Sequence, residues 1–148
     1  MSVQVELSGV EETLLIPLWA RAAETRRPDG LIRDPQAVAM VEALAYDFGK
    51  IAKDPATQTG IAIRTRLLDE AVTAYLTRHP GAVVLNLAAG LDTRFFRVGA
   101  AASCWYEVDL PGPMALRRQL IAPGERHRYV AGAALDEAWL AAVEVPPG

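Results

Sequence analysis

Residues 82–87 (AVVLNL) form a short, apolar run with two β-branched valines, and a turn of small residues, Ala88-Ala89-Gly90, follows it directly. This combination is typical of a buried strand in a parallel sheet. Residues 104–109 (CWYEVD) predict a second strand, which ends in an acid, and residues 128–131 (RYVA) predict a short third one. Strands that alternate with helical segments indicate an open α/β sheet with parallel strands.

Helical patterns precede the first strand. Leu14, Leu18 and Ala22 repeat at helical spacing, in a stretch that Pro17 is expected to kink or split. Asp34-Pro35 predicts the start of a second helix, with the acid as N-cap and the proline in the first helical position. The apolar stripe predicted for that helix consists of Val38, Val41, Ala45 and Phe48, before Gly49 ends it.

Three further helices and one loop are predicted from the same signals. Residues 50–59 are expected to form a polar loop, and a helix is expected from Gly60 to Arg78. Another helix is expected at residues 111–121, and Asp136 is expected to cap a last one that runs through Val143. The inward residues predicted for the helix at 60–78 are Ile63, Leu67, Val72, Tyr75 and Leu76.

The turn and the acid of the second strand together indicate a nucleoside site. Small residues at 88–90 let a ligand approach the backbone closely, because no side chain intervenes. Asp109 lies 19 positions after Gly90, which is about the distance at which an acid can hold ribose hydroxyls. A carboxylate accepts at two points and a ribose diol offers two donors, so the pattern predicts a site for an adenosine-type group.

The details of the turn favour one cofactor over another. A dinucleotide usually places its diphosphate on a glycine-rich turn of the form GxGxxG, but the corresponding positions here are Ala88, Gly90 and Thr93. Asp92 would repel a diphosphate, whereas S-adenosylmethionine has no phosphate and carries a cationic sulfonium. The spacing alone is weak evidence, and it leaves an NAD(P)-dependent oxidoreductase open as an alternative.

Composition excludes several other classes of protein. The net charge of −3 gives no reason to expect a nucleic-acid or membrane partner, and no apolar stretch is long enough to span a bilayer. The N-terminus has no basic residue ahead of an apolar run, so no signal peptide is predicted, and we expect a cytoplasmic protein. Cys104, His79 and His127 lack ligand spacing, so no metal site is predicted, and His127 has no obvious partner.

Four segments of the chain carry recognisable motifs. Two are the strand and turn segments, residues 84–97 (VLNLAAGLDTRFFR) and residues 106–111 (YEVDLP). The third segment comprises Ala20-Arg21-Ala22, Glu24, Arg27-Pro28-Asp29 and Asp34-Pro35, and the fourth comprises Arg64-Thr65-Arg66 with Asp69. In this order they resemble the motifs of the leucine carboxyl methyltransferase family, whose bacterial members include tetracenomycin-type polyketide O-methyltransferases.

The resemblance implies roles for particular residues. Arg64 is expected to bind the carboxylate of the methionine moiety, since a guanidinium can bind a carboxylate in two places. Ala88, usually glycine in the family, and Gly90 are expected to line the turn under the cofactor, and Asp109 is expected to hold the ribose. The family often has an acid near the adenine after the third strand, and the corresponding residues here are Ala133 or Ala134. No catalytic residue is assigned.

The fold implied by the resemblance is that of a class I methyltransferase. We expect an α/β protein with an N-terminal helical cap at residues 1–59, followed at residues 60–148 by the first half of a Rossmann-like parallel sheet. In that topology a fourth strand lies beside the first, so we expect this chain to be the N-terminal part of a longer protein. Without that strand, residues 83–87 would form an exposed apolar edge.

The function implied is that of an S-adenosylmethionine-dependent O-methyltransferase. Its acceptor is expected to be a carboxylate or hydroxyl of a small molecule, with a polyketide-like metabolite as one candidate. Because residues 133 and 134 are not acidic, a degenerate domain that keeps the fold without catalysis is a further alternative.

Overall fold

The computed structural model of the chain describes Val3, residues 9–51 and residues 54–145. By their mutual contacts the residues divide into two compact units. We call residues 1–71 together with 91–93 the helical unit, and residues 72–90 together with 94–148 the sheet unit. The three residues that follow the Ala88-Ala89-Gly90 turn therefore belong to the helical unit, although they lie between segments of the sheet unit in the sequence.

The helical unit begins with a 3-10 helix, η1 (Gly9–Leu14), which continues into α1 (Leu15–Arg26). The change from 3-10 to α-helix falls between Leu14 and Leu15, so the split expected at Pro17 was wrong. Pro17 lies in the first turn of α1, where its missing N–H removes no hydrogen bond within the helix. The buried apolar residues of α1 are Leu15, Leu18, Ala20 and Ala22.

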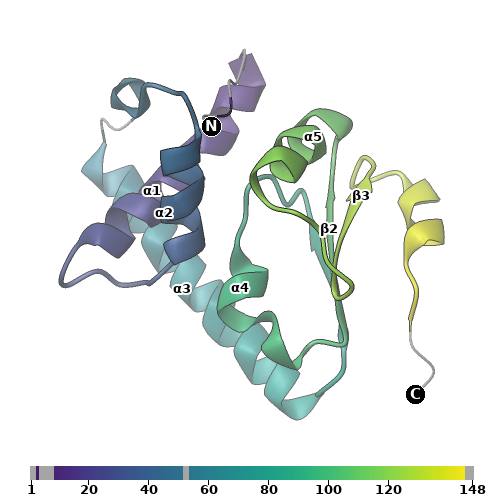
Figure 1. The fold of residues 1–148 in the computed structure, drawn as a ribbon. Helices are drawn as coiled ribbons and strands as arrows, with labels where there is room; N and C mark the ends of the chain where they lie inside the picture. Colours follow the sequence, from purple (N-terminus) through teal and green to yellow (C-terminus); the bar gives the residue numbers. More distant parts are fainter. Residues whose placement is uncertain (1–2, 4–8, 52–53, 146–148) are drawn as a thin grey trace. The chain divides into compact units, whose positions relative to one another are not determined.

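Helix α2 (Pro35–Ala43) packs against α1 (Figure 1). Asp34 is its N-cap, as predicted, and the Asp34 carboxylate accepts a hydrogen bond from the N–H of Ala37 at 3.0 Å. The helix ends at Ala43 rather than at Gly49, and a separate 3-10 helix, η2, spans Phe48–Lys50.

The apolar stripe predicted for α2 was wrong by one residue. Ala37, Met40 and Leu44 are buried, whereas the predicted Val38 and Val41 are only half-buried and Ala45 is exposed. The cause is Asp34, whose buried side chain faces the interior. Residues three and four apart share a helix face, so an inward Asp34 places Ala37 inward as well.

Helix α3 (Pro55–Arg78) begins at Pro55, inside the segment that was predicted to be a loop. Asp54 accepts hydrogen bonds from the N–H groups of Ala56 and Thr57, at 3.0 and 3.2 Å. This repeats the Asp-Pro start of α2, and the signal was available in the sequence.

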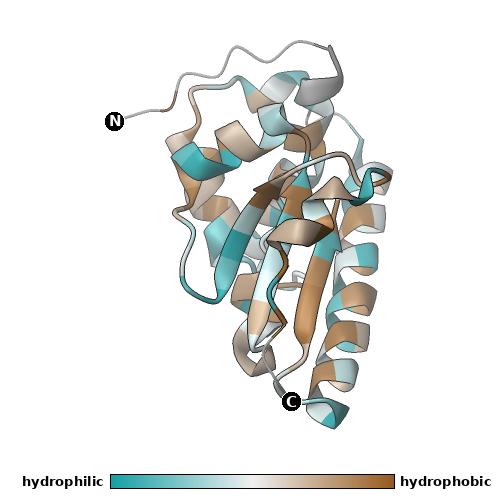
Figure 2. Ribbon diagram, turned by 90° about the vertical axis from the view of Figure 1, so that its right-hand side faces the viewer, coloured by the Kyte–Doolittle hydropathy of each residue, from teal (hydrophilic) through white to brown (hydrophobic). Residues whose placement is uncertain are grey.

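The inward residues predicted for α3 were mostly wrong. Leu76 is 2% exposed and Val72 is half-buried, but Ile63, Leu67 and Tyr75 are 46%, 59% and 52% exposed. Figure 2 shows apolar and hydrophilic residues alternating along this helix. The buried residues of α3 are Ile61, Ala62, Thr65 and Leu76, and the predicted Ile63, Leu67 and Tyr75 lie outside that set.

The sheet unit contains three parallel strands in the order β1 (Val83–Leu87), β2 (Cys104–Asp109) and β3 (His127–Ala131). The predicted bounds agree with these to within one residue. Leu87 pairs with Val108, and Asp109 pairs with Ala131. The carboxyl ends of the strands therefore lie at one edge of the sheet, where the turn after β1 and the acid of β2 meet.

Each face of the sheet has its own core. On one face Leu76 of α3, Ala102 and Trp105 pack together with Phe95 of α4 (Arg94–Val98), a short helix that was not predicted. A 3-10 helix, η3 (Gly99–Ala101), joins α4 to the strand β2, and α5 (Pro111–Leu120) joins β2 to β3. The second core consists of Cys104, Tyr106, Val108 and Trp139.

Asp136 caps the last described helix as predicted, accepting from the N–H of Ala138 at 3.1 Å. That helix, η4 (Glu137–Ala142), is a 3-10 helix and not the α-helix that was predicted. It is short because the chain returns to the sheet at once, where the N–H of Glu144 donates to the Tyr106 hydroxyl at 2.9 Å.

Strand β1 forms one edge of the described sheet. Figure 2 shows it as mainly apolar, and Leu85 and Leu87 are 40% and 44% exposed. This agrees with the expected exposed apolar edge. Among the described helices none is long and apolar enough to span a membrane.

Candidate nucleoside site

The turn after β1 is unusually tight. Ala88 has a φ of 52° and Gly90 a φ of 50°, so two of its three residues lie in the left-handed region. Alanine adopts that region reluctantly because its Cβ crowds the backbone, whereas glycine adopts it freely. Between them, the N–H of Ala89 donates to the carbonyl of Val108 at 3.1 Å, which ties the turn to β2.

Gly90 and Asp109, 19 residues apart, are in direct contact. The N–H of Gly90 donates to Asp109 Oδ2 at 2.6 Å, and the N–H of Leu110 donates to Oδ1 at 2.7 Å. Each carboxylate oxygen thus accepts one backbone hydrogen bond, and a carboxylate has about four acceptor sites in all. The half-buried Asp109 keeps capacity for two more donors, such as a pair of hydroxyl groups.

The residues after β3 adjoin the same edge. The N–H of Gly132 donates to the Asp109 carbonyl at 2.8 Å, so the segment that leads into Ala133 and Ala134 is joined to the end of β2. Ala133 is exposed and Ala134 half-buried. Leu135, which sequence reasoning missed, is 98% exposed and offers an apolar surface in this loop. Its only signal in the sequence was its position after the two alanines.

Arg64 lies on α3, in the helical unit, and its side chain is exposed. The neighbouring Thr65 is buried, and Arg66 forms an ion pair with Glu70 at 2.8 Å. The helix thus presents the Arg64 guanidinium to solvent, where it is accessible to an anionic group.

Sequence reasoning noted Arg21 and Asp34 but gave them no joint role. Both are buried, and Arg21 Nε pairs with Asp34 Oδ2 at 3.0 Å. Arg21 Nη2 also donates to the Leu91 carbonyl at 2.7 Å, and the Thr93 hydroxyl donates to Asp34 Oδ2 at 2.5 Å. The pair therefore holds residues 91–93, which directly follow the turn.

Asp92 accepts a backbone hydrogen bond just before α4 begins. Its Oδ1 accepts the N–H of Thr93 at 2.8 Å, immediately ahead of α4. In a dinucleotide site the N–H groups at such a helix start bind phosphate oxygens. Here a carboxylate already takes one of them, and its charge would repel a phosphate.

A buried ionic cluster adjoins the turn within the sheet unit. Arg117 of α5 donates to Glu107 Oε1 at 2.9 Å, and His127 Nε2 lies 3.0 Å from the same oxygen. Arg117 also donates to the Gly90 carbonyl at 3.1 Å. The expectation that His127 lacks a partner was wrong, because its partners lie far away in the sequence.

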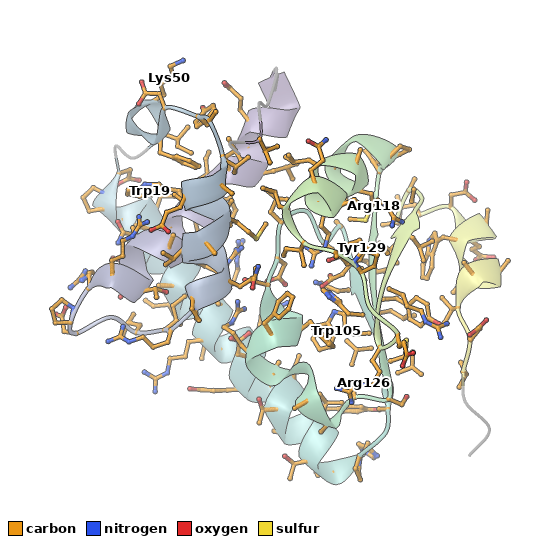
Figure 3. All side chains as sticks on the ribbon, viewed as in Figure 1. Trp19, Lys50, Trp105, Arg118, Arg126 and Tyr129 are labelled. Atoms are coloured by element: carbon orange, nitrogen blue, oxygen red, sulfur yellow. The ribbon has the colours of Figure 1, made fainter. Side chains whose placement is uncertain are left out.

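Two aromatic rings complete this cluster. The His127 ring stacks on Phe95 with centroids 4.1 Å apart. Tyr129 of β3 lies beside Arg118 of α5, as Figure 3 shows. The Arg117 Cζ is 4.8 Å from the centroid of the Tyr129 ring. Burial raises the pKa of the Tyr129 phenol, and the nearby Arg117 charge offsets part of that rise.

The chain is similar to a known family and to known methyltransferases over most of its length. The model of the leucine carboxyl methyltransferase family matches residues 15–144. The tetracenomycin polyketide synthesis O-methyltransferase TcmP of Streptomyces glaucescens is 36% identical over 141 residues, which cover 95% of this chain and 52% of that protein. An S-adenosyl-L-methionine-dependent methyltransferase of Gibberella zeae is 34% identical over 158 residues, covering 97% and 53%.

The chain has the Rossmann-like α/β architecture of a class I methyltransferase over its described residues. It belongs to the leucine carboxyl methyltransferase family. The chain spans about half the length of the curated relatives it matches.

The residues present fit an S-adenosylmethionine molecule. The left-handed turn at Ala88 and Gly90 carries no large side chain, and Asp109 keeps acceptor capacity beside it. Leu135 and the two alanines provide an apolar surface instead of an acid in the loop after β3.

The left-handed conformation of Ala88 predicts that Ala88→Gly stabilises the chain. Relief of the Cβ crowding is expected to raise the free energy of unfolding by up to about 1 kcal/mol, net of the greater freedom of glycine in the unfolded state. Urea unfolding measures this change. The control is Ala89→Gly, because Ala89 is buried and has no positive φ, and it is expected to destabilise. Equal destabilisation by both would contradict the assigned strain.

The buried Arg21–Asp34 pair predicts a large effect of Asp34→Asn. The substitution leaves the Arg21 charge buried without its anion and is expected to lower the free energy of unfolding by about 3–5 kcal/mol. The matched control is Glu42→Gln, which removes the exposed Arg26–Glu42 pair and is expected to change it by less than about 1 kcal/mol. Similar midpoints in urea for both variants would show that the buried pair contributes no more than the exposed one.

Proposed function

We propose that this chain binds S-adenosylmethionine and belongs to a methyltransferase that uses it as methyl donor. The observation that carries the proposal is the contact between Gly90 and Asp109 at 2.6 Å. It puts a carboxylate with remaining acceptor capacity beside a turn without large side chains, at the carboxyl edge of a parallel sheet. Ligands of open α/β sheets bind at that edge.

Each part of the cofactor has a candidate partner in the chain. Asp109 accepts the ribose hydroxyls, and Ala88 and Gly90 allow close approach of the ligand to the backbone. Ala133 and Ala134 contribute backbone groups near the adenine, with Leu135 as an apolar contact. The exposed Arg64 guanidinium is suited to the carboxylate of the methionine moiety, because it offers paired donors.

The proposed reaction is transfer of a methyl group to an oxygen of a small molecule, either a carboxylate or a hydroxyl. The bound cofactor supplies an activated methyl group, so the main task of the protein is to hold the acceptor oxygen in line with that methyl group. The named role of the Streptomyces relative in polyketide synthesis supports a polyketide-like acceptor. No residue of this chain is proposed as a catalytic base.

The two alternatives are an NAD(P)-dependent oxidoreductase and a degenerate domain without catalysis. An NAD(P)-dependent oxidoreductase needs a diphosphate site, and Asp92 already holds the Thr93 N–H where that site would lie. A degenerate domain without catalysis is favoured by the absence of an acid at residues 133 and 134. The family membership supports the methyltransferase over the oxidoreductase.

Calorimetry with S-adenosylhomocysteine, NAD and NADP tests the proposal. We expect the chain to bind S-adenosylhomocysteine and to bind neither nicotinamide cofactor comparably. Asp109→Ala should weaken binding by roughly 1.5–3 kcal/mol, the range for hydrogen bonds to a charged group. The control is Asp47→Ala, which removes an exposed acid of the helical unit that caps Gly49.

Tighter binding of NAD or NADP would overturn the methyltransferase assignment. Equal affinity of the Asp109→Ala variant and the unchanged chain would remove Asp109 from the ribose site. Asp109 accepts two backbone N–H groups, so its removal could also destabilise the turn. Thermal unfolding of each variant therefore checks that its affinity is measured on folded protein.

A further inference from the structure

Glu107 carries a carboxylate that is fully buried in the middle strand of the sheet. Asn86 Nδ2 donates to its Oε2 at 2.7 Å, while Arg117 Nη2 and His127 Nε2 approach its Oε1 at 2.9 and 3.0 Å. A buried charge is tolerated only when it is paired and hydrogen-bonded. These contacts therefore hold Glu107 in one position, and Glu107 in turn holds Arg117.

Arg117 reaches two groups at once, because a guanidinium is planar and presents its donors in different directions. Nη2 donates to Glu107, and Nη1 donates to the carbonyl of Gly90 at 3.1 Å. The Tyr129 ring covers the guanidinium, whose Cζ lies 4.8 Å from the ring centroid. Arg117 is fully buried, so water does not compete for these contacts.

Gly90 is held through both of its peptide groups. Its carbonyl accepts from Arg117, and its N–H donates to Asp109 Oδ2 at 2.6 Å. Glycine can adopt many backbone conformations, so its own φ preference does not select the value of 50°. The bond to Arg117 holds the peptide group after the Gly90 Cα and the bond to Asp109 holds the one before it, so the two bonds together select the conformation of Gly90.

We propose that Arg117 is a positioning residue for the ribose of the cofactor. It orients Gly90, and the Gly90 N–H orients the Asp109 carboxylate toward the ribose hydroxyls. The ligand in this inference rests on the proposed function, but the positioning of Gly90 does not. Arg117 acts through Gly90 and Asp109 and is not itself a ligand.

Arg117→Lys tests the inference, because lysine keeps the positive charge near Glu107 but lacks the planar fork that reaches Gly90. The matched control is Arg118→Lys on the same helix. Arg118 is exposed and donates to the Tyr129 carbonyl at 3.0 Å, with no bond to the turn. Both variants remove an arginine fork from α5, and only one of them is expected to affect Gly90.

Amide hydrogen exchange measures the positioning without any ligand. We expect Gly90 exchange to accelerate about tenfold or more in Arg117→Lys, because the bond to Asp109 opens locally. The Ala89 amide is the internal control, since it donates to the Val108 carbonyl. It should change little, and Arg118→Lys should leave both amides unchanged. Equal acceleration of both amides, or no acceleration at Gly90, would overturn the inference.

A charge-neutral double variant covers the case in which Arg117→Lys fails to fold. Glu107→Gln combined with Arg117→Gln removes both charges together, so no buried carboxylate is left without its cation. The same selective acceleration at Gly90 is expected. Equal acceleration at Ala89 and Gly90 in this variant would show that Arg117 stabilises the whole turn and does not position Gly90 specifically.

Ligand binding then tests the connection to the ribose. S-adenosylhomocysteine should bind about tenfold more weakly to Arg117→Lys, because the Asp109 carboxylate is no longer oriented. Its 2′,3′-dideoxy form, which lacks both ribose hydroxyls, should bind the variant and the unchanged chain alike. Equal losses for both ligands would overturn the ribose role. If the unchanged chain binds neither ligand, the proposed function has failed, and hydrogen exchange still decides whether Arg117 positions Gly90.

Discussion

The buried carboxylate of Glu107 is the constraint on which the candidate site depends. A charge inside the sheet must be paired, and Arg117 supplies the pair while its remaining donor holds the Gly90 carbonyl. The helical unit contains a second pair of the same kind, in which Arg21 binds Asp34 and holds the Leu91 carbonyl. The carbonyls of Gly90 and Leu91 thus each accept a hydrogen bond from a buried arginine, and each of these arginines is paired with a buried acid.

This arrangement fixes the backbone of a loop. Loops are usually the mobile part of a fold, but residues 88–93 here have several of their backbone groups bound by side chains or strands. The turn keeps Ala88 in a left-handed conformation at some cost in stability, and the surrounding contacts compensate for it. A rigid turn lets a ligand meet preformed donors and acceptors, so less ordering is required on binding.

The sequence predicted those features that depend on local pattern. The strand bounds followed from apolar runs. The spacing marked Gly90 and Asp109 as parts of one candidate site, but the hydrogen bond between them was found only in the structure. The start of α3 was missed although Asp54-Pro55 repeats the signal at Asp34-Pro35. The partners of His127 and the inward face of α2 could not be predicted, since both depend on long-range pairing. An acid inside an apolar strand could have signalled a buried cation such as Arg117.

The turn and Asp109 together are proposed to bind the ribose of S-adenosylmethionine. The most direct measurement is a crystal structure of the chain with S-adenosylhomocysteine. We expect ribose hydroxyl oxygens about 2.5–2.8 Å from the Asp109 carboxylate, with the Gly90 N–H still bound to it. A ligand whose ribose lies beyond hydrogen-bond reach of Asp109, or that occupies another part of the chain, would contradict it.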